Sequence, residues 1–117
     1  ANNETGRMQP VGEIAKIAHR HGALYHCDAT QTFLKNSSPL PIGESGEDVC
    51  DLLTVSFHKV NGPKGVGALY VRGGVKVKPF VSGGEQEREL RGGTENLIGI
   101  AGAGAAVRDH LKNPSDN

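Results

Sequence analysis

The chain has 117 residues, with 13 basic and 13 acidic side chains and a formal net charge of zero. Its length allows one domain at most, and its charge balance gives no electrostatic reason to expect nucleic acid or an anionic membrane as a partner. No apolar run approaches the length of a membrane span, and no signal peptide is recognisable at the N-terminus.

The first predicted element is an amphipathic helix that begins near Pro10 and ends at Gly22. A short strand over residues 23–27 follows it and ends at a polar turn, residues 28–31. A helix followed by a short apolar strand is typical of half of a βαβ unit, whose parallel strands carry functional side chains at their carboxyl ends. The helix has one apolar face, formed by residues at helical spacing: Val11, Ile14, Ala15 and Ala18.

The middle of the chain is predicted to hold a long loop and two further strands. Residues 35–51 form a surface loop rich in Ser, Pro and Gly, and a short turn over residues 31–33 precedes it. The strands cover Leu52–Ser56 and residues 66–72. Residues 75–78 alternate between apolar and charged side chains, as an edge strand would.

The last predicted element is a helix from Glu95 to Leu111, with Thr94 as its N-cap. We expect a partial domain over residues 1–112 and a polar tail over residues 113–117. The buried side of the helix is expected to be formed by residues at helical spacing: Leu97, Ile100, Ala101, Gly104, Val107 and Leu111.

A glycine-rich stretch, residues 56–67, connects the second strand to the third. Lys59 follows the strand beside a hydroxyl and an imidazole, where a lysine can act as an amine nucleophile toward a carbonyl. The alternative is a solvated lysine in a glycine hairpin, and Lys64 is a second, weaker candidate. Asp28 and Gln31 follow another strand, so we expect them at the same sheet edge as Lys59.

Other polar positions have two interpretations each. Asp28 can form a charged hydrogen bond to a ring nitrogen or cap a turn. Thr94 can bind a phosphate with its hydroxyl and the free N–H groups behind it, or serve as an ordinary N-cap. The run Gly62–Gly67 is not a dinucleotide fingerprint, because it leads into a strand rather than into a helix.

The cysteines and histidines predict no metal site. His19 and His21 do not share a helix face, and His26 and Cys27 point to opposite faces of a strand. Cys27 is interpreted as a small buried residue. Cys27 and Cys50 form no disulfide framework, which favours reduced thiols in the cytoplasm or, in a eukaryote, in an organelle such as the mitochondrion.

The composition predicts a thin core. Glycine accounts for 17 residues, only 36% of residues are hydrophobic and 4% are aromatic. Because glycine has no side chain to bury, the core that this chain builds alone is small. Residues Ala1–Glu4 resemble the end of a preceding segment, and we expect the chain to be part of a larger protein.

Five motifs follow one another along the chain: Asn2-Asn3-Glu4-Thr5-Gly6; His26-Cys27-Asp28-Ala29-Thr30-Gln31; Ser56-Phe57-His58-Lys59 with Gly62-Pro63-Lys64-Gly65; Gly83-Gly84-Glu85-Gln86-Glu87; and Arg91-Gly92-Gly93-Thr94-Glu95-Asn96. This order resembles that of the cysteine desulfurases, pyridoxal-phosphate enzymes of the class V aminotransferase superfamily. The resemblance runs from residue 2 to about residue 107. It implies an α/β fold, part of the fold-type-I large domain, with a mostly parallel sheet and flanking helices.

The resemblance implies roles around the pyridine ring of pyridoxal 5'-phosphate. Lys59 is similar to the lysine that binds this cofactor as an imine. Asp28 is similar to the carboxylate that keeps the pyridine nitrogen protonated, so that the ring accepts electrons. Asn3 and Gln31 resemble residues that contact the phenolic oxygen of the cofactor or its substrate side.

The resemblance also implies how the phosphate is bound. Ser56 and His58 are similar to phosphate ligands. Thr94 is similar to a threonine that reaches the phosphate of the neighbouring subunit's cofactor, which implies a homodimer.

The chain departs from the family pattern at several positions. Phe57 stands where a small residue is usual, and its bulk is expected either to crowd the site or to fill a pocket behind it. Asn61 stands where an aromatic residue or histidine is common, and Glu85 replaces a third glycine. The loop over residues 35–51 is longer than usual.

The family's nucleophilic cysteine, which takes up sulfur as a persulfide, lies C-terminal to the lysine, and neither Cys27 nor Cys50 matches it. Also unmatched are an N-terminal glycine-rich phosphate turn, the ring-stacking aromatic residue or histidine, and the arginine that binds the substrate carboxylate.

The function implied by the resemblance is conversion of L-cysteine to L-alanine with transfer of the sulfur to an enzyme cysteine. The implied partners are a second subunit and a sulfur acceptor or iron–sulfur scaffold protein. We expect the isolated chain to be inactive. Two alternatives remain, a selenocysteine lyase or other class V enzyme, and a non-catalytic truncated protein.

Overall fold

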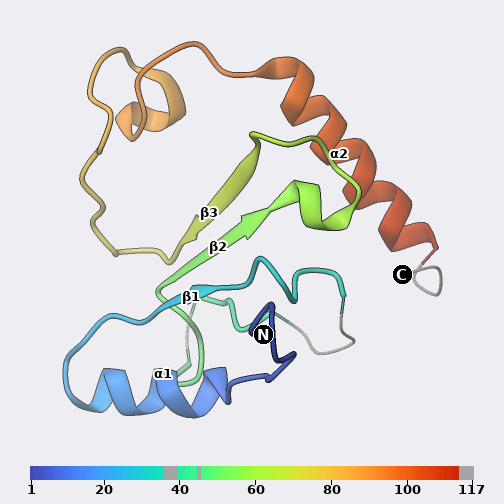
Figure 1. The fold of residues 1–117 in the computed structure, drawn as a ribbon. Coiled ribbons are helices and arrows are strands. Elements are labelled where there is room, and N and C mark those ends of the chain that lie inside the picture. Colours follow the sequence, from blue (N-terminus) through green and yellow to red (C-terminus); the bar gives the residue numbers. More distant parts are fainter. Residues whose placement is uncertain (36–39, 45, 114–117) are drawn as a thin grey trace.

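The computed structural model describes residues 1–35, 40–44 and 46–113, and its centre is a three-stranded sheet in the order β1–β2–β3 (Figure 1). β1 (His26–Asp28) and β2 (Leu52–Ser56) are parallel. β3 (Gly67–Val71) is antiparallel to β2, so the described sheet is mixed. Within the described ranges, no helix combines the length and the apolar character needed to cross a membrane.

The first half of the fold follows the sequence pattern. α1 (Val11–Arg20) begins after Pro10 and ends before Gly22, whose φ of +67° lies in the left-handed region. The following strand is shorter than expected and begins at His26 rather than at residue 23. Residues 30–35 form the turn expected after it, and the loop predicted over 35–51 lies partly outside the described residues.

α2 (Leu97–Lys112) begins later than predicted, and Thr94 is not its N-cap. Asn96 takes that position, because its Oδ1 accepts a hydrogen bond from the Gly99 N–H at 3.0 Å. The cap position therefore moves two residues along the chain from the predicted one.

The predicted buried side of α2 was wrong. Leu97, Ile100 and Leu111 are 71%, 45% and 65% exposed, whereas Gly99 and Ala103 are buried. The reason is that α2 packs on the turn after β2 through its small residues, with Gly99 against Val66 and Gly102 against Pro63. Small side chains allow this close approach, and the larger apolar residues face outward.

The edge strand expected over residues 75–78 does not form. The Arg72 N–H still donates to the Asp51 carbonyl oxygen at 2.9 Å, as a continuation of the ladder. Gly73 and Gly74 then turn the chain, with Gly74 at a φ of +85°. The chain therefore leaves the sheet immediately after β3. The polar tail expected over residues 113–117 lies outside the described residues except for Asn113.

The core lies under one face of the sheet, and its fully buried centre is small, as the composition predicts. Its centre is Ala29, Leu53 and Val55. The side chains packed against this centre are Phe33, Leu40, Phe57 and Tyr70.

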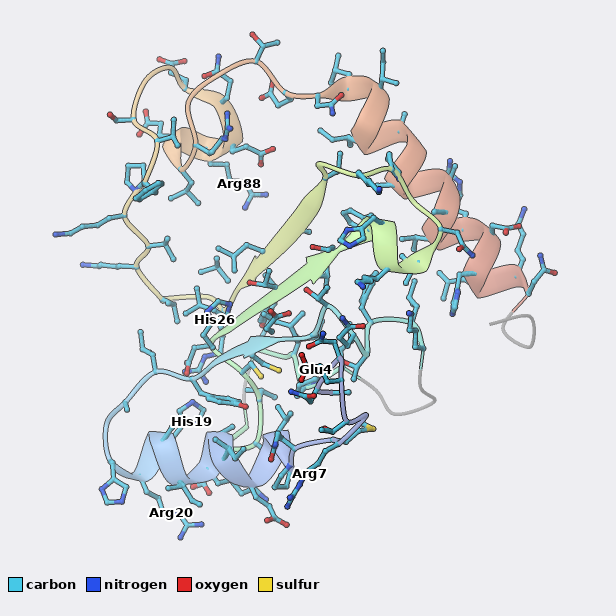
Figure 2. All side chains as sticks on the ribbon, viewed as in Figure 1. Glu4, Arg7, His19, Arg20, His26 and Arg88 are labelled. Carbon is cyan, nitrogen blue, oxygen red and sulfur yellow. The ribbon has the colours of Figure 1, made fainter. Side chains whose placement is uncertain are left out.

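A buried aspartate fixes the start of β2. Asp51 is 0% exposed and accepts hydrogen bonds from the Tyr25 N–H at 2.7 Å and from His19 Nε2 at 2.9 Å, and it forms an ion pair with Arg72. Figure 2 shows His19 on the side of α1 that faces the sheet. Asp51 therefore joins α1, the residue before β1 and the residue after β3.

Candidate functional site

The parallel pair β1–β2 gathers polar side chains, together with Leu52, on one face, and apolar side chains lie on the other. His26 pairs with Leu52 and Asp28 pairs with Thr54, and paired residues project from the same face of a sheet. Because strand residues alternate, Ser56 shares that face, whereas Cys27, Leu53 and Val55 point to the core side. The exposed face thus carries the side chains that can meet a ligand. They are His26, Asp28, Thr54 and Ser56.

Asp28 is an exposed carboxylate at the carboxyl end of β1. Its Oδ1 accepts a hydrogen bond from the Thr30 N–H at 2.9 Å. Hydrogen bonds from the side chain and backbone of Thr30 lower the pKa of Asp28, and the charge of His26 adds to this effect. Asp28 is therefore ionised near neutral pH and suited to accept a hydrogen bond from a protonated ring nitrogen.

Lys59 lies in η1 (Phe57–Val60), a turn of 3₁₀ helix that follows β2 directly. Val60 is buried and Lys59 is half-buried, whereas His58 is exposed. The turn closes at Gly62, whose N–H donates to the Phe57 carbonyl oxygen at 2.8 Å. A Cβ at Gly62 would stand 2.8 Å from that same oxygen, so only glycine fits. Lys59 is thus held by a compact turn rather than by an open hairpin.

Phe57 does not crowd this turn from the ligand side. Its ring packs on the core centre and meets the Phe33 ring edge-on, with centroids 6.1 Å apart and an interplanar angle of 79°. Of the two outcomes expected for this bulky residue, filling a pocket behind the site is the one observed.

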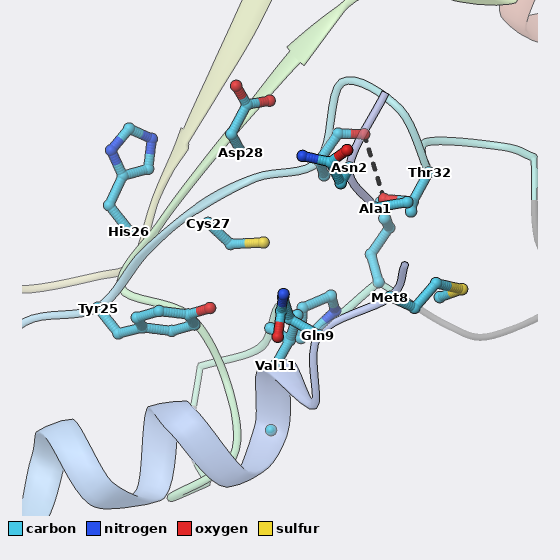
Figure 3. Close-up of a pocket in the computed structure, with 14 residues that line it drawn as sticks. Ala1, Asn2, Met8, Gln9, Val11, Tyr25, His26, Cys27, Asp28 and Thr32 are labelled. Atoms are coloured by element: carbon cyan, nitrogen blue, oxygen red, sulfur yellow. Dashed lines mark hydrogen bonds between the residues drawn. The ribbon is translucent and has the colours of Figure 1, made fainter. Parts of the chain in front are cut away.

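The N-terminal turn that carries Asn3 is closed by its neighbour, Asn2. The Asn2 Oδ1 accepts hydrogen bonds from the N–H groups of Glu4 at 3.0 Å and Thr5 at 2.9 Å. Asn2 also lines a cavity together with Asp28, so this turn lies near the end of β1 (Figure 3). Asn3 itself is exposed.

Gln31 is half-buried in the turn that follows β1, between Thr30, which binds Asp28, and Thr32, which lines the same cavity. It therefore sits close in the chain to Asp28. Asp28 and Gln31 lie at the carboxyl end of β1, and Ser56 and Lys59 lie at the carboxyl end of the parallel strand β2. These residues therefore come from the same end of the strand pair.

The cavity in Figure 3 has a volume of about 520 Å³ and lies beside β1. Its polar lining includes Gln9, Tyr25, Cys27 and Asp28. Lys59 does not line it, so the cavity is not the space between Asp28 and Lys59.

Both cysteines are free thiols in unreactive surroundings. Cys27 is half-buried and, like Asp28, lines the cavity, although the two side chains leave β1 on opposite faces, and Cys50 is buried. Burial raises the pKa of both thiols, and that of Cys50 reaches about 12. Since the thiolate is the nucleophile, neither cysteine is poised to attack.

Thr94 is exposed and is not brought to Asp28. The segment between η2 (Gln86–Glu89) and α2 lies beyond β3, whereas Asp28 ends β1 at the other edge of the sheet (Figure 1). Among the predicted site residues, Thr94 therefore stands apart from the rest.

Sequence reasoning missed two polar residues on the site face, His26 and Thr54. Their side chains interact, with His26 Nε2 2.7 Å from Thr54 Oγ1. The available signal was the spacing of two between His26 and Asp28, which puts both on one face of a strand.

Comparison with known proteins identifies the family. Residues 1–113 match the class V aminotransferase family, and the chain belongs to it. A cysteine desulfurase from Klebsiella pneumoniae is 51% identical over 106 residues, which cover 91% of this chain and 25% of that protein. The chain spans about a quarter of the length of the curated relatives it matches.

Solved structures agree with this assignment and confirm the predicted α/β fold class. A NifS-like protein from Rickettsia africae has a TM-score of 0.87 and 36% identity, covering 100% of this chain and 31% of that one. A structure described as SspA in complex with cysteine has a TM-score of 0.81 and 42% identity, and the match covers 92% of this chain and 30% of that one. The sequence resemblance to cysteine desulfurases is therefore confirmed.

Proposed function

We propose that the whole protein is a pyridoxal-phosphate-dependent cysteine desulfurase and that this chain supplies the centre of its cofactor site. The observation that carries the proposal is the shared edge of β1 and β2. An ionised carboxylate, Asp28, ends one strand, and an amine, Lys59, follows the other in a rigid turn. The similarity to cysteine desulfurases supports the choice of reaction.

The donor set fits the cofactor. When bound, pyridoxal phosphate supplies an aldehyde for covalent attachment and a ring that accepts electrons. Lys59 would hold the cofactor covalently through its amine and would move protons at Nζ. Asp28 holds the proton on the ring nitrogen, because a carboxylate with a lowered pKa leaves the proton on its partner.

The remaining residues orient the cofactor and substrate. Ser56, the last residue of β2, and His58, in η1, bind the phosphate with a hydroxyl and an imidazole. Gln31 and Asn3 lie on the side of Asp28 and contact the phenolic oxygen or the substrate. Thr94, separated from Asp28 by the width of the sheet, serves the cofactor of a second subunit, and this separation supports a homodimer.

The sulfur acceptor belongs outside this chain. Cys27 lies on the wrong face of β1, and Cys50 is buried with a pKa raised to about 12. We therefore propose that a cysteine elsewhere in the whole protein accepts the sulfur from L-cysteine and passes it to an acceptor or iron–sulfur scaffold protein. The unpaired thiols of Cys27 and Cys50 support a reducing compartment such as the cytoplasm.

The first test is an absorbance spectrum of the protein mixed with pyridoxal phosphate. A visible band that borohydride reduction removes is expected in the wild type and in Lys64→Ala, but not in Lys59→Ala. Lys64 is a matched control, since it is an exposed lysine of the same loop. A band that survives in Lys59→Ala but is lost in Lys64→Ala would overturn the assignment.

The second test measures alanine release from L-cysteine and from L-selenocysteine, with a reductant present. Turnover of cysteine by the whole protein is expected, and none by the isolated 117-residue chain. Release from selenocysteine alone would assign a selenocysteine lyase instead. Turnover by the isolated chain would show that the acceptor cysteine is not required.

A further inference from the structure

The polar face of the parallel pair holds a cluster that no role above uses. His26 and Asp28 are two residues apart on β1 and project from the same face. His26 Nε2 lies 2.7 Å from Thr54 Oγ1 on β2. Thr54 is in turn the register partner of Asp28. Thr54 is therefore hydrogen-bonded to the imidazole and stands opposite Asp28 in the strand pair, on the same face.

The orientation of Asp28 is fixed by few contacts. β1 has three residues, Asp28 is exposed, and its carboxylate is bound by Thr30 from the turn that follows. A carboxylate that holds a ring nitrogen must keep both its orientation and its negative charge. The hydrogen bond between His26 on β1 and Thr54 on β2 can supply the fixed orientation, and the positive charge of His26 can favour the ionised form of the carboxylate.

We propose that His26 and Thr54 are a positioning pair for Asp28: the imidazole fixes the threonine hydroxyl beside the carboxylate, and together they hold the carboxylate in the orientation that binds the cofactor's pyridine nitrogen. This inference rests on the proposed function. It adds two residues to the site and predicts that they act as one unit.

Besides the hydrogen bonds from Thr30, the charge of His26 lowers the pKa of Asp28. Imidazoles carry a positive charge in the acid range where carboxylates titrate. The titration of Asp28 therefore reports on His26 directly, without any cofactor.

The cofactor-free experiment follows the Asp28 carboxyl carbon by NMR as the pH is lowered. Removing the imidazole in His26→Ala is expected to raise the midpoint, and His26→Gln is expected to raise it as well because the amide is uncharged. His21→Ala is the matched control, because His21 is an exposed histidine at the end of α1. An identical midpoint in the wild type and His26→Ala would overturn the electrostatic part of the proposal.

The second experiment measures the Kd of pyridoxal phosphate by absorbance. His26→Ala and Thr54→Val are each expected to weaken binding about three- to tenfold, and the double variant no further, because the two residues act through one hydrogen bond. His26→Gln is expected to restore affinity, since its amide can still donate to the Thr54 hydroxyl. His21→Ala leaves affinity unchanged.

Additive losses in the double variant, or equal affinity of His26→Ala and His21→Ala, would overturn the positioning pair. If the wild type forms no cofactor band, the proposed function fails instead, and the NMR midpoints still decide whether His26 acts on Asp28. The two failures are therefore distinguishable.

Discussion

Two aspartates mark opposite ends of the same strand pair, and their surroundings are opposite as well. Asp51 precedes β2, is 0% exposed and contacts His19, Tyr25 and Arg72. Asp28 ends β1, is exposed and is bound by the next turn of the chain. One end of the sheet thus holds the fold together, and the other leaves a charge available to a ligand. Changes at the two ends are expected to separate stability from binding.

The largest effect on stability is expected from Asp51→Ala. Removing one member of a buried charge network leaves its partners unpaired and costs about 3 to 5 kcal/mol of unfolding free energy. Urea unfolding followed by circular dichroism measures it. Asp48→Ala is the control, because Asp48 is exposed, and it is expected to stay within about 0.5 kcal/mol of the wild type. A similar loss in both variants would contradict the special role of Asp51.

A smaller effect is expected from His19→Ala. His19 joins α1 to Asp51 and, through Nδ1, to the Glu47 carbonyl oxygen at 3.0 Å. Losing a hydrogen bond to a charged group costs about 1.5 to 3 kcal/mol. The matched variant His21→Ala, two residues along α1, is expected to unfold at the same urea concentration as the wild type. Equal midpoints for the two variants would mean that His19 contributes nothing.

Lowering the pH is expected to reduce the difference in unfolding free energy between the wild type and Asp51→Asn. Burial raises the pKa of Asp51, but the hydrogen bonds from Tyr25 and His19 and the charge of Arg72 outweigh it and hold the pKa below its usual value. A carboxyl whose pKa is lower in the folded than in the unfolded protein stabilises the fold fully above its unfolded pKa of about 3.9. This stabilisation is lost as the pH falls through the folded pKa. Unfolding free energies at pH 7, 5, 4 and 3 test this. A difference in unfolding free energy that is the same at pH 3 as at pH 7 would refute this prediction.

The smallest stability effect is expected from Asp28→Asn. Asp28 is exposed, and its amide analogue can still accept the Thr30 N–H, so unfolding should change by no more than about 0.5 kcal/mol. The absorbance band with pyridoxal phosphate should nevertheless weaken strongly, because a neutral amide does not hold the ring nitrogen's proton. A variant that binds the cofactor normally would remove Asp28 from the site.

The fold was largely predictable where local pattern and packing agree. The helical spacing of its apolar residues predicts α1, and a run of apolar residues predicts β2. For α2 the pattern was not sufficient. Helical spacing identifies a stripe of apolar residues, but it does not show which side of the helix packs against the rest of the protein. Gly99 and Gly102 decide that side by allowing close contact with Val66 and Pro63.

The candidate site was also predictable only in part. Asp28 and Lys59 were placed on one edge because the carboxyl ends of parallel strands meet there. The link between His26 and Thr54 could not be predicted, since it depends on the register of two strands that are far apart in sequence. The role of Asp51 could not be predicted for the same reason, because its partners come from three separate parts of the chain.

The edge-on contact between Phe33 and Phe57 has a consequence for the candidate site. Phe33 lies two residues after Gln31, and Phe57 lies two residues before Lys59, so the contact beneath the sheet sets the spacing of the two turns that carry them. A change in ring size at either position would move these turns relative to each other. Substitutions in the core beneath the sheet are therefore expected to alter the geometry of the two turns without changing any residue of the candidate site.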